Sequence, residues 1–178
     1  PRDQVATPGN YPQLENHWAK KEILYLIESN ILSAKDPEKV VPNQAITKGT
    51  ALEVLVKSLT RVPYYSHYYG ETTNQTFENI DKDHPLYPIV EIAAQMGILS
   101  KDQKTINLDE KLTREELAVW YVKALGLEKA AKHSNIYNVP FKDRNSISEQ
   151  NRGYVALSNA LGIFVGDSKN NFHPKQEV

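Results

Sequence analysis

Three short apolar phrases recur along the chain at a nearly constant distance. They are Asn30-Ile31-Leu32, Gly97-Ile98-Leu99 and Gly162-Ile163-Phe164, and they are separated by 67 and then 65 residues. A second landmark repeats at 66 residues, because Ile46-Thr47-Lys48 returns as Leu112-Thr113-Arg114. Self-similarity at a fixed period is the signature of a repeated structural unit. The spacing therefore predicts three diverged copies of one unit.

Each copy shows the periodicity of helices. Ahead of the first phrase, Ile23, Leu26 and Ile27 have the i, i+3, i+4 spacing that puts side chains on one helix face. A second helix is expected to begin at Thr47, and another at Thr113. We therefore predict an all-α fold in which the second helices bury one face each, namely Ala51, Leu55 and Leu59 in the first copy and Leu117, Tyr121 and Leu125 in the second.

The landmarks also set the predicted boundaries. The first repeat covers residues 11–60 and the second 77–131, with a tyrosine-rich linker, 61–76, between them. A second linker, 132–140, leads into a third repeat, 141–178. The same count would start the third copy's second helix after Val178, so we expect this copy to lack its last helix. The apolar surface left uncovered is a candidate for self-association.

Composition excludes several classes of protein. With 21 basic and 22 acidic residues, the chain lacks the basic surplus of a nucleic-acid-binding protein. The absence of cysteine excludes disulfides, thiolate zinc sites and a cysteine nucleophile. The longest apolar run, residues 118–122, is too short to insert into a membrane.

Catalytic and metal-binding motifs are also missing from the sequence. The five histidines have no metal-ligand spacing, and there is no nucleophile elbow, phosphate-binding glycine loop or dinucleotide fingerprint. We therefore expect no cofactor, no metal and no enzymatic activity. A carboxylate pair assembled only in the folded protein is the alternative that sequence leaves open.

The order of the short elements resembles the S-layer homology family. That family's repeat contains, in order, F-x-D, H-W-A, a helix, G-I, a loop G-x-F-x-P, and T-R-A-E opening a second helix. Here these elements are divided among the copies, as His17-Trp18-Ala19, Thr113-Arg114-Glu115-Glu116, Phe141-Lys142-Asp143, Gly162-Ile163 with Gly166, and Phe172-His173-Pro174. The first copy departs from the pattern, because Thr47-Lys48-Gly49-Thr50 lacks both the arginine and the glutamate.

The resemblance implies a fold and a function. It implies three repeats around a pseudo-threefold axis, with the second helices forming a central bundle and ligand bound in the grooves between repeats. It also implies an extracellular protein at the bacterial cell wall or cell surface. The expected partner is secondary cell-wall polysaccharide carrying a pyruvate ketal on an amino sugar, which would anchor a surface protein non-covalently.

Arg114 is the first candidate ligand contact. Thr113 and Glu116 are explained by a capping box, in which each satisfies a backbone N–H of the other, but a capping box needs no arginine. A cation at a helix N-terminus opposes the helix dipole, so Arg114 there suggests an anion that both would attract. A guanidinium can bind a carboxylate, such as that of pyruvate, through two hydrogen bonds. A solvated surface residue or an ion pair between repeats is the alternative.

The other candidates follow from the same elements. Lys48 stands where the first copy would have its arginine and keeps the charge without the planar fork, so we rank it below Arg114. Trp18 could stack on a sugar, although packing in the core is the expectation we favour for an aromatic at a helix start. Thr113 and Asp143 complete the set of candidate ligand-binding residues. The rival function is a structural or protein-interaction repeat whose glycan sites have decayed.

Overall fold

The computed structural model describes residues 10–34, 37–60, 74–133 and 138–178. These residues form two compact units, Pro1–Ala45 and Ile46–Val178, which are considered one at a time. The secondary structure described is helical, and the described residues contain two isolated β-bridges but no strand. The all-α prediction is therefore confirmed. Most of the tyrosine-rich linker lies outside the described residues.

The first unit is built around one helix. It contains the short 3-10 helix η1 (Pro12–Leu14), the helix α1 (Lys20–Glu28) and a second 3-10 turn, η2 (Pro37–Lys39). Leu14, Ile27 and Ile31 are its buried apolar side chains. The predicted stripe on α1 is thus buried at Ile27, whereas Ile23 and Leu26 are half-exposed.

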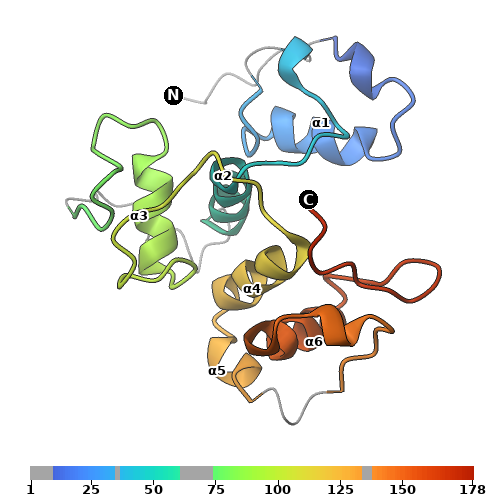
Figure 1. Ribbon diagram of the computed structural model, residues 1–178. Helices are drawn as coiled ribbons and strands as arrows, with labels where there is room; N and C mark the ends of the chain where they lie inside the picture. The colour runs from blue at the N-terminus through green and yellow to red at the C-terminus, as the bar shows by residue number, and fades with distance from the viewer. Residues whose placement is uncertain (1–9, 35–36, 61–73, 134–137) are drawn as a thin grey trace. The chain divides into compact units, whose positions relative to one another are not determined.

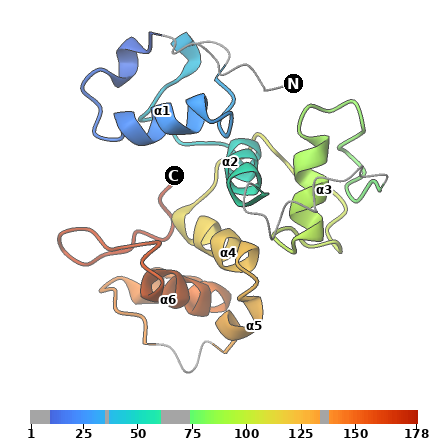
Figure 2. The same ribbon diagram turned by 180° about the vertical axis from the view of Figure 1, so that it is seen from behind.

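The second unit consists of two neighbouring helix pairs. The helix α2 (Lys48–Thr60) packs against α3 (Tyr87–Gln95), and α4 (Arg114–Ala124) packs against α6 (Arg152–Ala160). The views in Figures 1 and 2 agree on both pairs. The short helix α5 (Glu128–Ala131) and two 3-10 turns, η5 (Arg144–Ser146) and η6 (Glu149–Asn151), complete the unit. In each pair a second helix packs on the first helix of the following predicted copy.

Burial on the second helices differs in part from the prediction. Ala51 and Leu55 are buried on α2, as expected, and Leu59 packs against the same core. On α4 the prediction was wrong for Leu125, which is 38% exposed because the helix ends at Ala124. The residues of α4 that are buried instead contact three different clusters and so surround the helix: Ala118, Trp120, Val122 and Ala124.

The recurring apolar phrases prove to be helix ends. Asn30, Gly97 and Gly162 each have a positive φ, of 55°, 77° and 73°, immediately after the C-cap of α1, α3 and α6. The next residue donates its backbone N–H to the carbonyl five residues earlier, as from Ile98 to Ala93 at 2.9 Å. This is the Schellman arrangement, which favours glycine and tolerates asparagine.

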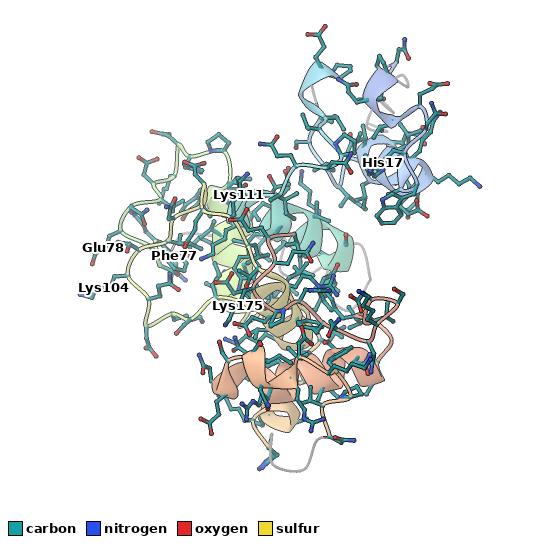
Figure 3. The ribbon with its side chains drawn as sticks, turned by 45° about the vertical axis from the view of Figure 1, so that its right-hand side comes forward. His17, Phe77, Glu78, Lys104, Lys111 and Lys175 are labelled. Atoms are coloured by element: carbon teal, nitrogen blue, oxygen red, sulfur yellow. The ribbon has the colours of Figure 1, made fainter. Side chains whose placement is uncertain are left out.

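A short segment, called the lead-in, precedes the first helix of each copy, at residues 11–14, 77–80 and 141–144. Its third residue bonds to a segment that is distant in the sequence. Gln13 donates its side-chain amide to the Glu38 carbonyl at 3.2 Å. Asn79 exchanges two hydrogen bonds with the backbone of Ile106, at 2.8 and 3.1 Å. Phe77, two residues earlier, is fully buried, whereas Glu78 lies at the outer edge of the unit with Lys104 (Figure 3). The lead-in is thus bonded to the segment that follows the first helix of its copy.

Backbone pairing links the segments that precede the second helices. Thr47 forms an antiparallel bridge with Lys111, and Thr113 forms another with Glu177. The Val178 N–H donates to the Leu112 carbonyl at 2.9 Å, and its carbonyl accepts from Ile46. Residues 46, 112 and 178 occupy equivalent positions in the sequence. The pseudo-threefold axis and the central bundle remain predictions.

Candidate functional site

The start of α4 forms the predicted capping box. The Thr113 hydroxyl accepts from the Glu116 N–H at 3.4 Å, and the Glu116 carboxylate accepts from the Thr113 N–H at 2.8 Å. The next two N–H groups, on Arg114 and Glu115, donate to the carbonyls of Gln176 and Pro174. Every N–H of this first turn therefore has a protein acceptor. These N–H groups are therefore not free to bind the anion that the sequence suggested at this helix terminus.

The Arg114 side chain is committed to the third copy. Its Nε donates to the Phe172 carbonyl at 2.7 Å and its Nη2 to the Val165 carbonyl at 3.2 Å. The guanidinium carbon lies 5.2 and 5.0 Å from the ring centroids of Phe164 and Phe172, in cation–π contact. Burial lowers the pKa of Arg114, and the charge of Asp143 partly opposes that shift. Arg114 therefore holds the loop 165–172 against α4.

Asp143 supports the same loop from the other side. Its two carboxylate oxygens accept from the backbone N–H groups of Phe172 and His173, each at 2.8 Å. This is the counterpart of the Asn79 bonds in the second copy. Asp143 and Arg114 thus act on neighbouring stretches of one loop, and both point their polar groups at backbone atoms.

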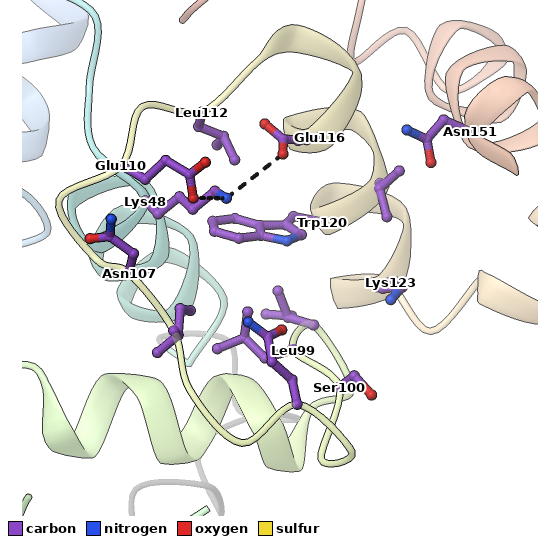
Figure 4. A pocket seen from close by; sticks show the side chains of 14 residues that line it. Lys48, Leu99, Ser100, Asn107, Glu110, Leu112, Glu116, Trp120, Lys123 and Asn151 are labelled. Carbon is purple, nitrogen blue, oxygen red and sulfur yellow. Dashed lines mark hydrogen bonds and ion pairs between the residues drawn. The ribbon is translucent and has the colours of Figure 1, made fainter. Parts of the chain in front are cut away.

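Lys48 lies at the equivalent position on α2, and its surroundings are different. Its side chain lines a cavity of about 280 Å³ together with residues of the second copy. Figure 4 shows its amine between two carboxylates, Glu110 and Glu116. The Nζ donates to Glu110 Oε2 at 2.6 Å and lies 3.8 Å from Glu116 Oε1. Here the cation faces a pocket instead of backbone carbonyls.

The remaining lining of this Lys48 pocket combines an aromatic ring with polar groups. Trp120 from α4 is 9% exposed and borders the cavity, as does Lys123 one turn further along. The loop of the second copy and the start of α6 supply hydroxyl and amide groups, from Ser100, Gln103, Asn107 and Asn151. The charged residues of the lining are Lys48, Lys123, Glu110 and Glu116, so its formal charge is balanced.

A second cavity, of about 440 Å³, lies beside the start of α2. Gly49 borders it, and a Cβ at that position would come within 2.9 Å of the Leu86 side chain. At the equivalent position on α4 is Glu115, which is 4% exposed and accepts from the Ser148 N–H and hydroxyl at 2.9 and 2.8 Å. Lys175 also donates to the Glu115 carboxylate.

The Glu115 carboxylate is held as an anion. Burial raises its pKa, but hydrogen bonds from Lys175 and Ser148, together with the charge of Lys175, more than offset this effect and leave the pKa below its ordinary value. The group therefore acts as a charged tie between α4 and the third copy.

Trp18 lies in the first unit, and the structure overturns the prediction that it packs in the core. Its side chain is 88% exposed, and its ring centroid lies 5.6 Å from that of His17. His17 accepts from the Ala19 N–H through Nδ1 at 3.2 Å, and its Nε2 meets Asn43 Oδ1 at 3.1 Å. The histidine thereby shapes the turn before α1, which leaves the tryptophan in solvent.

Trp120, Lys123 and Glu110 line the pocket although no sequence pattern predicted them there. Trp120 and Lys123 are three apart on α4, which places them on one side of the helix. The sequence contains that spacing, but the prediction for this helix was based on the apolar stripe of Leu117, Tyr121 and Leu125, which lies on another side. Glu110 is on a loop, where periodicity carries no information.

The described residues contain no cluster of three or more acidic, histidine or cysteine residues arranged for a metal ion. No helix among them combines the length and the apolar character needed to span a membrane.

Two segments of the chain match the family model described as the S-layer homology domain. They are residues 14–52 and 140–178, which coincide with most of the first predicted copy and with the third. The geometry agrees with the family elements in these segments, since the Phe141-Lys142-Asp143 element fastens the loop that carries Phe172 and Pro174.

Two curated relatives resemble the chain over most of its length. It is 26% identical over 165 residues to an amylopullulanase of Thermoanaerobacterium thermosulfurigenes, and 26% identical over 165 residues to the exoglucanase XynX of Acetivibrio thermocellus. Each alignment covers 93% of this chain but only 8% and 14% of the respective relative. The similarity is therefore to a small part of each of these much longer proteins.

Proposed function

We propose that this chain is a non-catalytic anchoring module that holds a bacterial surface protein to the cell envelope by binding secondary cell-wall polysaccharide. The match of two segments to the S-layer homology domain carries the proposal. We assign the segment between them to a third unit of the same kind, because its lead-in and its helix end make corresponding contacts. The site of action is extracellular, at the cell wall or cell surface.

We place the polysaccharide in the Lys48 pocket. The cavity lies between the start of α2 and the loop of the second copy, so it corresponds to a groove between repeats. Its side-chain hydroxyl and amide groups suit the hydroxyls of a sugar, and the edge of the largely buried Trp120 adds apolar lining. Such a mixture is typical of carbohydrate sites.

The two lysines of the pocket favour a sugar that carries a carboxylate. An ammonium group binds a carboxylate through a charge-assisted hydrogen bond, and the side chain of Lys48 is 17% exposed, which limits screening by water. A pyruvate ketal on an amino sugar presents such a carboxylate. In this proposal Lys48 is the primary contact, and Arg114, Thr113 and Asp143 keep the neighbouring groove in shape.

Trp18 is assigned a separate part in binding. An indole that is 88% exposed has a free face on which a sugar ring can stack. It belongs to the first unit, so we treat its contribution as independent of the Lys48 pocket.

One set of observations favours the rival function, a structural or protein-interaction repeat. The polar groups of Arg114 are bonded to backbone carbonyls, and the charges of the Lys48 pocket are balanced. In that case the glycan sites would have lost their function, and the polysaccharide would not bind.

Sedimentation with isolated cell walls separates the two functions. The purified chain is mixed with native sacculi and with sacculi stripped of their secondary polysaccharide, and bound protein is measured after centrifugation. We expect sedimentation with native sacculi alone. Failure to sediment with either kind would support the protein-interaction repeat, and equal sedimentation with both would place the binding on another wall component.

A further inference from the structure

The two carboxylates beside Lys48 differ in how firmly they are held. Glu116 is fixed by the capping box, because its Oε2 accepts from both the N–H and the hydroxyl of Thr113, at 2.8 and 2.9 Å. It lies 3.8 Å from the Lys48 amine, a longer contact than a direct hydrogen bond. Glu116 is therefore a permanent part of the pocket wall.

Within the part of the chain that the structure describes, the Glu110 carboxylate is held only by Lys48. The Glu110 side chain is 56% exposed, and among the described residues its carboxylate contacts the Lys48 amine, at 2.6 Å. The backbone of Glu110 is anchored independently, since its carbonyl accepts from the Lys48 N–H at 2.8 Å. The carboxylate can therefore rotate away from the lysine while the loop stays in place.

Gln176 is the residue of the third copy that is equivalent to Glu110, and it carries no charge. Gln176 accepts from the Arg114 N–H at 2.9 Å through its backbone carbonyl, just as Glu110 accepts from Lys48. Glutamine thus fits the same backbone arrangement without a charge. There the cation bonds to the carbonyls of Phe172 and Val165 and lies over two phenylalanine rings.

From these contacts we propose that Glu110 sets the charge selectivity of the Lys48 pocket by competing with the carboxylate of the ligand for the lysine. A bound carboxylate must displace that of Glu110, whereas a neutral sugar leaves the ion pair in place. This inference rests on the proposed function, because it assumes that polysaccharide binds in the pocket. Glu110 is a specificity-determining residue outside the family elements that the sequence carries.

Replacing Glu110 with glutamine tests this competition. Exposed ion pairs are weak, so their loss is expected to tighten binding of an anionic ligand by about twofold to fivefold. Binding of a ligand without the carboxylate should not change. The fold is expected to tolerate the substitution, because Gln176 occupies the equivalent place, and thermal unfolding of the variant checks this. Glu110→Asp, whose shorter side chain reaches less far toward Lys48, provides a second variant.

Calorimetry with two probes gives the measurement. The probes are purified pyruvylated wall polysaccharide and the same polysaccharide after acid removal of the ketal. Glu78→Gln is the matched control, because it makes the same change in net charge on an exposed residue that pairs with Lys104 and does not line the pocket. We expect tighter binding for Glu110→Gln alone, and only with the pyruvylated probe.

Other calorimetric results would contradict either the competition by Glu110 or the proposed function. Unchanged or weaker binding by Glu110→Gln, with normal binding by the unaltered chain, would overturn the competition and leave the proposed function standing. Equal gains with both probes, or an equal gain for Glu78→Gln, would also overturn it. Absence of binding by the unaltered chain and both variants would overturn the proposed function together with the inference.

Discussion

Two cations at equivalent positions have different tasks in this protein. Arg114 and Lys48 both follow the threonine that precedes a second helix, yet Arg114 bonds to backbone carbonyls and Lys48 lines a pocket. The difference lies in the neighbouring copy. Phe164 and Phe172 offer rings to the guanidinium, whereas the equivalent residues beside Lys48 are Leu99 and Ile106. At these two positions the lysine has no phenylalanine rings to contact, and its amine pairs with the carboxylates of Glu110 and Glu116.

Arg114 is accordingly expected to contribute to stability. Arg114→Ala removes two hydrogen bonds to carbonyls and the contact with two rings, which should lower the free energy of unfolding by about 1.5–3 kcal/mol. Arg114→Lys should lose less, because it keeps the charge. Urea unfolding of the three proteins measures both values. Equal midpoints for Arg114→Ala and the unaltered chain would show that the bonds to the loop are not needed, as expected for a ligand contact.

The candidate residues illustrate what could be predicted from sequence. Thr113 and Glu116 form the capping box because the spacing T-x-x-E fixes a local geometry. Asn30, Gly97 and Gly162 likewise end helices through local backbone preferences. The exposure of Trp18 could not be predicted in this way, because burial depends on which parts of the chain pack over a residue.

At the scale of elements, buried glutamates tie helices to other segments of the chain. Glu115 at the start of α4 accepts from Ser148, just before η6. Glu91 on α3 accepts in the same way from the N–H and hydroxyl of Thr76, at 2.8 Å each. Both glutamates are nearly fully buried. Each carboxylate therefore fastens a helix to a linker or turn residue whose position sequence periodicity does not predict.

The Glu115 tie predicts an acid-sensitive component of stability. Its pKa is lower in the folded chain than the ordinary value of 4.5, so folding favours the charged form. The stabilisation is therefore complete above that ordinary value and is lost as the pH falls through the lower pKa of the folded state. Glu115→Gln should reduce stability at neutral pH by about 1–2 kcal/mol.

Urea titrations between pH 7 and pH 3 compare the two proteins. The unaltered chain should lose more stability on acidification than Glu115→Gln, so the two curves should converge at low pH. Parallel curves would mean that the carboxylate gains nothing from Lys175 and Ser148 in the fold.

At the scale of the whole molecule, the repeat defined most of the fold but only part of the site. The all-α class and the positions of the second helices followed from a spacing of about 66 residues. The pocket did not, because it is lined by separate segments: the start of α2, residues 98–112, one side of α4 and Asn151. No local pattern in any one of them indicates that they meet. The self-association proposed for the third copy remains a prediction.

The most direct test of the account is the affinity of Lys48→Ala for purified pyruvylated wall polysaccharide, measured by calorimetry. A charge-assisted contact is worth about 1.5–3 kcal/mol, so the variant should bind about tenfold to a hundredfold more weakly than the unaltered chain. Lys104→Ala, which removes an equal charge from an exposed position outside the pocket, should bind normally. Equal affinities for Lys48→Ala and the unaltered chain would contradict the assignment of the Lys48 pocket as the polysaccharide site.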